Sequence, residues 1–233
     1  MQTMPKIEPF ERYAAAYDAW FDLYPWAFQS EVEAVRRFWP AACEGLEVGV
    51  GTGRFAEALG IRWGVEPSAA MRTMAGRRGI EALDGVAEAL PFGDERFDAL
   101  LMVTTLCFLD DPDRALDECR RVLKPSGLFV AGFVDARSEL GMRYAERRGE
   151  SRFYGEALFW SVPEVVAALM RRGFSAPAIA QTLFGPLDSM RETDPVKPGY
   201  GEGAFVVLAA SKRASRKPLQ KGTEGEHHDA FRG

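Results

Sequence analysis

The stretch LEVGVGTGRF, residues 46–55, decides the fold of this chain. An apolar run typical of a buried strand breaks into three glycines at alternate positions, Gly49, Gly51 and Gly53. Glycines at the end of a strand let the backbone turn sharply and let a ligand touch it, and the next helix offers free N–H groups to an anion. The spacing is G-x-G-x-G, whereas a dinucleotide loop has G-x-G-x-x-G, and Arg54 occupies that sixth position. The stretch therefore indicates either a nucleotide-type cofactor loop or a purely structural turn.

Strand and helix patterns alternate along the rest of the chain. Helical patterns separate apolar, strand-like runs at residues 46–50, 61–66, 80–86, 97–108, 128–134, 179–184 and 204–211. We expect an α/β fold, Rossmann-like and doubly wound, with a mostly parallel seven-stranded sheet. The last two runs lie close together in the sequence, which predicts an antiparallel C-terminal hairpin strand.

Composition narrows the function classes. A net charge of −5 does not favour nucleic acid as a partner, and no apolar run reaches the roughly 18 residues of a membrane span. Three cysteines without a C-x-x-C pair predict a reduced, cytoplasmic location and no metal site. The two histidines, His227 and His228, lie near the C-terminus, which disfavours a histidine base or a histidine-ligated metal.

Two acidic residues accompany the glycine stretch. Glu66 ends the second predicted strand, where a carboxylate can accept hydrogen bonds from both ribose hydroxyls. Glu47 lies inside the first predicted strand, where a charge needs a partner such as loop amides or a ligand ammonium. Glu66 could instead be an ordinary surface residue, and loop amides alone could satisfy Glu47, so the two acids favour a nucleoside site without requiring one.

These motifs resemble the class I S-adenosylmethionine-dependent methyltransferases, in particular the small-molecule group similar to ubiquinone and menaquinone biosynthesis enzymes. LEVGVGTGR resembles their first motif, and GVEPS their ribose-binding acidic segment. AEALPFGDERFDALLMV and DPDRALDECRRVLKPSGLFV are similar to the segments around their fourth and fifth strands. The resemblance covers residues 44–134 with specific motifs and extends loosely to residue 210.

The resemblance implies a site for the cofactor S-adenosylmethionine. The glycines would line its methionine part, Glu47 would orient its ammonium, and Glu66 would hold its ribose. Pro67 and Met71 would lie beside the adenine, and Tyr17 would close over the cofactor. The full set is Tyr17, Glu47, Gly49, Gly51, Gly53, Glu66, Pro67, Met71, Ala87, Glu88, Met102 and Val103.

Two positions depart from the family pattern. Val86 occupies the place of an aspartate that binds the adenine amino group, so adenine recognition would use Glu88, Asp84 or backbone alone. Cys107 and Phe108 occupy places where many members carry a histidine. A family-style histidine base is therefore missing, and no general base can be named.

The resemblance also divides the chain. We expect an N-terminal helical lid over residues 1–40, the S-adenosylmethionine-binding α/β domain over 41–211, and a disordered tail over 212–233. The lid segment carries an aromatic stripe that is either core or a cover over a ligand. Candidate acceptor-side residues are Tyr13, Trp20, Thr105, Phe108 and Tyr144, with Tyr17 and Thr105 as candidates for aligning the reactants.

The expected reaction is in-line methyl transfer to a small-molecule acceptor without a histidine base. Alignment and exclusion of water would be the main contributions of the protein. Two alternatives stay open: a nicotinamide-dependent Rossmann oxidoreductase, and a non-catalytic S-adenosylmethionine-binding protein. The sequence leaves open the acceptor, the methylated atom and the oligomeric state.

Overall fold

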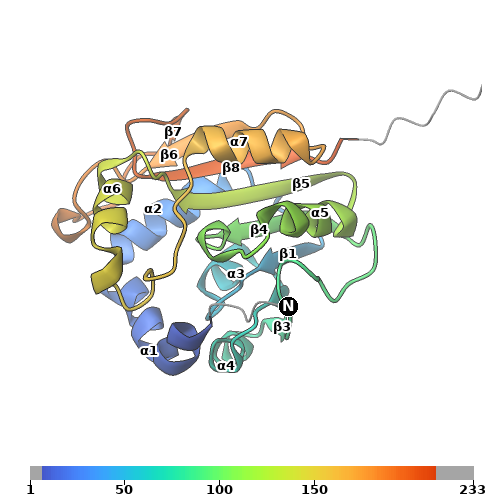
Figure 1. Cartoon of the computed structure of the whole chain (residues 1–233), viewed down its shortest axis with the longest axis horizontal. Coiled ribbons are helices and arrows are strands. Elements are labelled where there is room, and N and C mark those ends of the chain that lie inside the picture. The colour runs from blue at the N-terminus through green and yellow to red at the C-terminus, as the bar shows by residue number, and fades with distance from the viewer. Residues whose placement is uncertain (1–6, 214–233) are drawn as a thin grey trace, which may run out of the picture.

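An eight-stranded sheet in the order β3-β2-β1-β4-β5-β8-β6-β7 forms the centre of the fold (Figure 1). The computed structural model describes residues 7–213. The strands are β1 Gly45–Val48, β2 Trp63–Val65, β3 Glu81–Leu83, β4 Phe97–Val103, β5 Leu123–Val134, β6 Ala178–Thr182, β7 Lys197–Pro198 and β8 Phe205–Ser211.

The first five strands are parallel, and the C-terminal strands are antiparallel to their neighbours. Strand β8 lies between β5 and β6 and pairs antiparallel with both, from Leu128↔Ser211 to Val134↔Phe205 along β5. This confirms the mostly parallel, doubly wound sheet and its antiparallel C-terminal pair. The expected count of seven strands was one too low, because the two-residue strand β7 adds an edge that has no strand-like sequence pattern.

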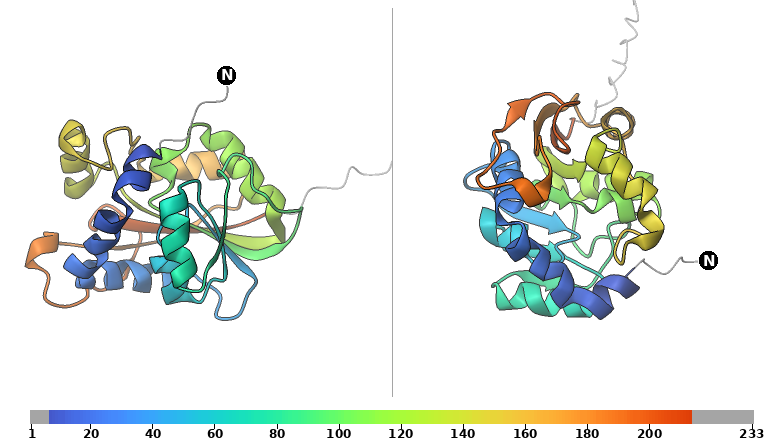
Figure 2. Two further views of the ribbon diagram at one scale, coloured as in Figure 1. Left: turned by 90° about the horizontal axis from the view of Figure 1, so that it is seen from below. Right: turned by 90° about the vertical axis from the view of Figure 1, so that its left-hand side faces the viewer.

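Helices cover both faces of the sheet, as alternating strands and helices require. Helices α5 and α7 lie on one face, helices α2, α3 and α4 lie on the other, and each face has its own apolar core (Figures 1 and 2). The helices are α1 Glu8–Leu23, α2 Pro25–Arg36, α3 Arg54–Leu59, α4 Ala69–Arg77, α5 Pro112–Val122, α6 Glu139–Glu146 and α7 Val162–Arg171.

Local sequence signals explain where helices begin. Asp111 accepts a hydrogen bond from the Arg114 backbone N–H at the start of α5, and Pro112 occupies the first helical position. At α7, the Ser161 backbone N–H donates to Glu164 at 2.8 Å, as in a capping box. Both helices begin at the residues these signals indicate, but α5 ends at Val122, where β5 begins at Leu123, earlier than the strand expected over 128–134.

One predicted strand ends earlier than its apolar pattern suggested. We expected a strand over 97–108, but β4 ends at Val103 and a short 3-10 helix occupies Leu106–Phe108. Thr104 adopts a left-handed conformation with φ +50°, which breaks the strand. The chain therefore turns at the carboxyl edge of the sheet, beside the glycine loop.

The expected lid and the expected tail belong to opposite ends of the chain. Helices α1 and α6 lie beyond the carboxyl ends of the parallel strands, where the expected lid belongs (Figure 1). The proposed tail lies outside the described residues, except Lys212 and Arg213; Lys212 donates to the Leu123 carbonyl at 2.6 Å. Within residues 7–213, no helix combines the length and apolar character needed to cross a bilayer.

Candidate active site

The glycine loop between β1 and α3 leaves its backbone accessible at one position. All three glycines have positive φ, +71° at Gly49, +54° at Gly51 and +87° at Gly53. A Cβ at Gly51 would meet only the Tyr17 ring, at 3.9 Å, whereas one at Gly53 would press on Ala75 at 3.1 Å. Gly53 therefore allows α3 to pack on α4, and Gly51 leaves space for a ligand against the loop.

Glu66 faces the loop and is buried. Its carboxylate accepts hydrogen bonds from the Gly51 and Ser68 backbone N–H groups, each at 3.0 Å, and the residue is 7% exposed. Burial raises the pKa of Glu66, and the two hydrogen bonds offset part of that effect. The carboxylate is thus held next to the loop, where the ribose-binding role requires it.

Glu47 is a buried carboxylate with one unused oxygen. The residue is 2% exposed, Oε2 has no hydrogen-bond partner among the described residues, and the other hydrogen bond comes from the Ala56 backbone. Burial raises the pKa of Glu47 well above its ordinary value, and the nearby Glu66 charge raises it further. An unsatisfied carboxylate oxygen at this depth fits a cationic ligand group, as the ammonium of a methionine moiety would supply.

The adenine end offers backbone and apolar surface. Met71 and Ala87 are buried, at 1% and 6% exposed. The Glu88 carboxylate accepts from the backbone of Asp110 at 2.9 Å, and Asp84 pairs with an arginine of α4 at 2.7 Å. Because both acidic candidates already have protein partners, the backbone near Ala87 is the remaining candidate for adenine recognition.

Two threonines after β4 have different surroundings. The Thr105 hydroxyl lies 3.2 Å from the Val48 carbonyl and 3.1 Å from the Val103 carbonyl, so it ties β4 to the end of β1. Thr104 hydrogen bonds to the Tyr17 side chain, whose pKa is raised, chiefly by burial. Thr105 therefore supports the glycine loop, while Thr104 and Tyr17 join α1 to the carboxyl edge of the sheet.

Charged contacts attach α1 to the loop, a feature that the sequence analysis missed. Asp18 accepts from Thr52 at 2.6 Å and pairs with Arg54 at 2.7 Å and Arg78 at 3.0 Å. Burial alone would raise the pKa of Asp18, but these hydrogen bonds and charges outweigh it and lower the pKa. Glu11 accepts from the Ser68 hydroxyl at 2.7 Å. The two acids lie seven positions apart in the sequence, on either side of a kink at Tyr13, and this spacing was the available signal.

Aromatic residues from several segments pack against one another, and we call this group the aromatic cover. Phe10 on α1 lies 5.7 Å from Tyr17 and 5.0 Å from Phe108, between ring centroids. Tyr144 on α6 stacks on Tyr154 at 5.4 Å. Phe153 and Tyr154 were not among the predicted site residues, because loop positions gave no periodic signal, and Phe10 belongs to the aromatic stripe of the N-terminal segment but was not predicted as a site residue. The cover therefore joins α1 to the segment after β5.

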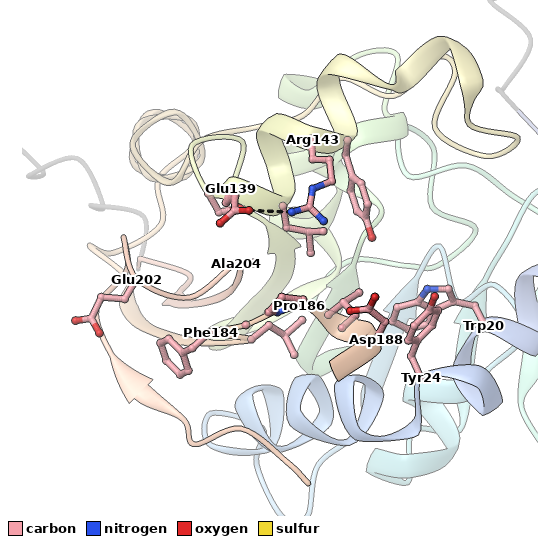
Figure 3. A pocket seen from close by; sticks show the side chains of 15 residues that line it. Trp20, Tyr24, Glu139, Arg143, Phe184, Pro186, Asp188, Glu202 and Ala204 are labelled. Atoms are coloured by element: carbon pink, nitrogen blue, oxygen red, sulfur yellow. Dashed lines mark hydrogen bonds and ion pairs between the residues drawn. The ribbon is translucent and has the colours of Figure 1, made fainter. Parts of the chain in front are cut away.

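A cavity of about 370 Å³ lies between α1, α6 and the segment after β6 (Figure 3). Trp20 and Tyr24 line it from α1, and Tyr144 lines it from α6. Tyr144 also lines a second, small cavity against Thr104. Tyr13 lines neither cavity and lies under the Arg152 guanidinium at 4.5 Å. Of the predicted acceptor-side residues, Trp20 and Tyr144 therefore meet at the larger cavity.

The sequence segments that form this site are similar to those of known methyltransferases. The family described as "Methyltransferase domain" matches residues 46–131. A crystal structure from Thermotoga maritima, of an S-adenosylmethionine-dependent methyltransferase described as a possible histamine N-methyltransferase, is 46% identical with a TM-score of 0.87. The similarity covers 89% of this chain and 100% of that one.

Curated relatives agree with this family. A malonyl-[acyl-carrier protein] O-methyltransferase of Geobacter sulfurreducens is 34% identical over 188 residues, 71% of this chain and 68% of the relative. An uncharacterised protein of Methanocaldococcus jannaschii is 42% identical over 203 residues, 87% of this chain and 98% of the relative. The nicotinamide alternative is thereby set aside. The chain belongs to the class I S-adenosylmethionine-dependent methyltransferases, and S-adenosylmethionine is its cofactor.

Proposed function

We propose that this enzyme methylates a small-molecule acceptor by in-line displacement, without a histidine base. The observation that supports a small acceptor is the cavity of about 370 Å³, which the lid helix α1, helix α6 and the segment after β6 enclose. This volume lies within the range of ligand pockets for small molecules. The cavity lies at the carboxyl edge of the sheet, the same edge as the glycine loop.

The protein side of the reaction is binding and alignment. Glu47 would hold the cofactor ammonium, Glu66 would hold the ribose, and the loop at Gly51 would contact the methionine part. When bound, S-adenosylmethionine supplies a methyl group that its sulfonium already activates. Tyr17, buried under the aromatic cover, would help to exclude water and to fix the direction of approach.

The absence of a histidine from residues 1–226 limits the acceptors. A neutral amine, a thiolate or an already ionised oxygen can react without a strong base, whereas an unactivated alcohol cannot. Two similar proteins are named for acceptors of this kind: a malonyl-[acyl-carrier protein] O-methyltransferase and a possible histamine N-methyltransferase. We further propose that the reaction occurs in the cytoplasm and involves no nucleic acid, in keeping with three cysteines that form no disulfide and the net charge of −5.

Calorimetry and product release test this proposal together. We expect S-adenosylhomocysteine to bind the wild-type protein and to bind Glu47→Gln at least about 10-fold more weakly, because a charged hydrogen bond contributes about 1.5–3 kcal/mol. A panel of amines, thiols and carboxylic acids should then yield S-adenosylhomocysteine from S-adenosylmethionine with at least one class. Cofactor binding without turnover on any class would favour the non-catalytic alternative instead.

A further inference from the structure

The carboxyl edge of β4, where the acceptor has to approach the glycine loop, has little free space. Tyr17 lies at this edge, because its ring is 3.9 Å from the place of a Cβ at Gly51 and its hydroxyl hydrogen bonds to Thr104. The cavity beside Thr104 has a volume of about 20 Å³, which is room for about one water molecule. Pockets for small molecules have volumes of about 300–1,000 Å³. A side chain must therefore move before an acceptor can bind beside Thr104.

The ring of Tyr154 occupies space next to this cavity. Tyr154 and Tyr144 both line the cavity with Thr104. The Tyr154 ring stacks on Phe108, with 5.9 Å between centroids and 15° between planes, and on Tyr144, with 5.4 Å and 17°. Phe108 follows β4 and Tyr144 lies on α6, so two separate segments present ring faces to the same place. We call this place, which the Tyr154 ring fills and Phe108 and Tyr144 flank, the aromatic slot.

The segment that carries Tyr154 is held by local contacts. Most residues between 145 and 156 are exposed, and the Tyr154 backbone N–H donates to the Ser151 hydroxyl at 3.0 Å, three positions away. Tyr144, in contrast, belongs to helix α6, which Ser138 caps. Moving Tyr144 would disturb a capped helix, whereas moving Tyr154 disturbs a turn on the surface. Tyr154 is therefore the ring that can leave the slot at the lower cost.

The larger cavity adjoins the slot through Tyr144. This residue lines both the small cavity and the cavity of about 370 Å³. Trp20 and Tyr24 line the larger cavity from α1 (Figure 3). A ligand ring stacked on Tyr144 would thus lie beside a space that can hold the rest of the molecule.

We propose that the acceptor is a flat aromatic or heteroaromatic molecule, and that its ring displaces the Tyr154 side chain from the aromatic slot. The proposal rests on the small-molecule function proposed above and names its acceptor class. A planar ring restores the stacking contacts that Phe108 and Tyr144 lose when Tyr154 leaves, whereas a saturated ring of the same size does not. The reacting atom of the acceptor is an uncharged nitrogen or a thiolate, since both react without a strong base.

Two thiols that differ only in their ring test the slot. Phenylmethanethiol carries a flat ring and cyclohexylmethanethiol a saturated ring on the same CH₂–SH group. Their affinities are measured by calorimetry at pH 7 with the protein saturated with S-adenosylhomocysteine. We expect phenylmethanethiol to bind at least about 5-fold more tightly, because it stacks on two rings. Equal affinities, or tighter binding of the saturated thiol, would overturn the proposal.

The variant Tyr154→Ala tests whether this ring has to leave. We expect it to bind phenylmethanethiol at least about 10-fold more tightly than the wild type does, because the slot is already open. Weaker binding would mean that Tyr154 is part of the wall of the site and would contradict its displacement. Tyr200→Ala, at a half-exposed position, is the matched control and should bind both thiols as the wild type does.

Amide hydrogen exchange tests the displacement in the wild-type protein, without a substitution that could disturb folding. Exchange over residues 151–157 should become faster when phenylmethanethiol binds, because the turn that contains the Tyr154 N–H and carbonyl hydrogen bonds opens. Helix α7 should show no change. Slower or unchanged exchange over residues 151–157 would overturn the proposal.

Turnover distinguishes this proposal from the function on which it rests. Phenylmethanethiol should release S-adenosylhomocysteine from S-adenosylmethionine with a higher kcat/KM than cyclohexylmethanethiol. Equal kcat/KM values would overturn the aromatic slot and leave the methyltransferase proposal standing. Preferred binding of phenylmethanethiol with faster exchange over residues 151–157, but without turnover of any nucleophile, would support the slot and count against the proposed methyl transfer.

Discussion

The loop after β2 and helix α2 surround a buried carboxylate in different ways. At the cofactor end, Glu66 accepts two backbone hydrogen bonds from segments within 15 residues of it in the sequence. On α2, Glu31 is buried with no hydrogen-bond or ion-pair partner among the described residues, and burial raises the pKa of Glu31 to about 8. Backbone hydrogen bonds therefore hold the first carboxylate, whereas the second is buried by helix packing alone.

This difference has a thermodynamic consequence. A carboxylate that backbone N–H groups already solvate can stay ionised before the ligand arrives. An unpartnered one holds a proton until a cation replaces it. Glu66 is thus positioned by hydrogen bonds in the free protein, whereas Glu47 keeps one oxygen without a partner among the described residues, and burial raises the pKa of Glu47 and of Glu31.

The largest effect should appear in the pH dependence of stability, through Glu31 on α2. The folded state raises the pKa of Glu31 from its ordinary 4.5 to about 8 and so binds an extra proton between these values. The free energy of unfolding of the wild type should fall as pH rises through this window, by about 2–4 kcal/mol more than that of Glu31→Gln. Urea unfolding at pH 5, 7 and 8.5 measures the free energy of unfolding of both proteins. If it changes with pH in the same way in both, the predicted effect of Glu31 is wrong.

The next effect concerns the cofactor end. Glu66→Ala should weaken binding of S-adenosylhomocysteine at least about 100-fold, because two hydrogen bonds from the ribose to a charged group are lost. Glu81→Ala, on the neighbouring strand β3 and paired with an exposed arginine, should bind normally. Calorimetry compares the two variants, and an undiminished affinity in Glu66→Ala would remove its ribose role.

A smaller effect tests how the lid is attached. Asp18→Asn should lower the free energy of unfolding by about 2 kcal/mol, because Arg54 and Arg78 lose a largely buried partner. Asp22→Asn, whose side chain is 70% exposed, should cost less than about 0.5 kcal/mol. Amide hydrogen exchange over α1 should rise only in the first variant; equal exchange in both would argue against the attachment.

The smallest expected effect concerns Tyr17 on α1. Tyr17→Phe removes the hydroxyl that hydrogen bonds to Thr104 and should cost about 1 kcal/mol of stability. Affinity for S-adenosylhomocysteine should fall less than about 5-fold, because the ring still covers the loop at Gly51. Tyr200→Phe, at a half-exposed position, is the control. If Tyr17→Phe lost more affinity for S-adenosylhomocysteine than Glu66→Ala, the expected order of effects would be wrong.

The same division explains what the sequence could predict. The glycine spacing and the acid at the end of β2 are local patterns, so the mostly parallel sheet and the cofactor could be inferred before the structure was known, while the roles of the cofactor residues stay predictions. Asp18 and Glu31 meet their surroundings only through contacts between segments far apart, and no periodic pattern marks Tyr154. The two-residue strand β7 was not predicted for a related reason: it pairs with β6 through its backbone and has no apolar alternation.

The position of β8 inside the sheet sets the order in which this chain can be completed during synthesis. Residues Phe205–Ser211 fill the gap between β5 and β6, so until they leave the ribosome the long strand β5 has one bare edge. Such an edge invites pairing with other nascent chains. A stop codon before Phe205 should therefore give an insoluble product, even though every residue of the glycine loop would be present.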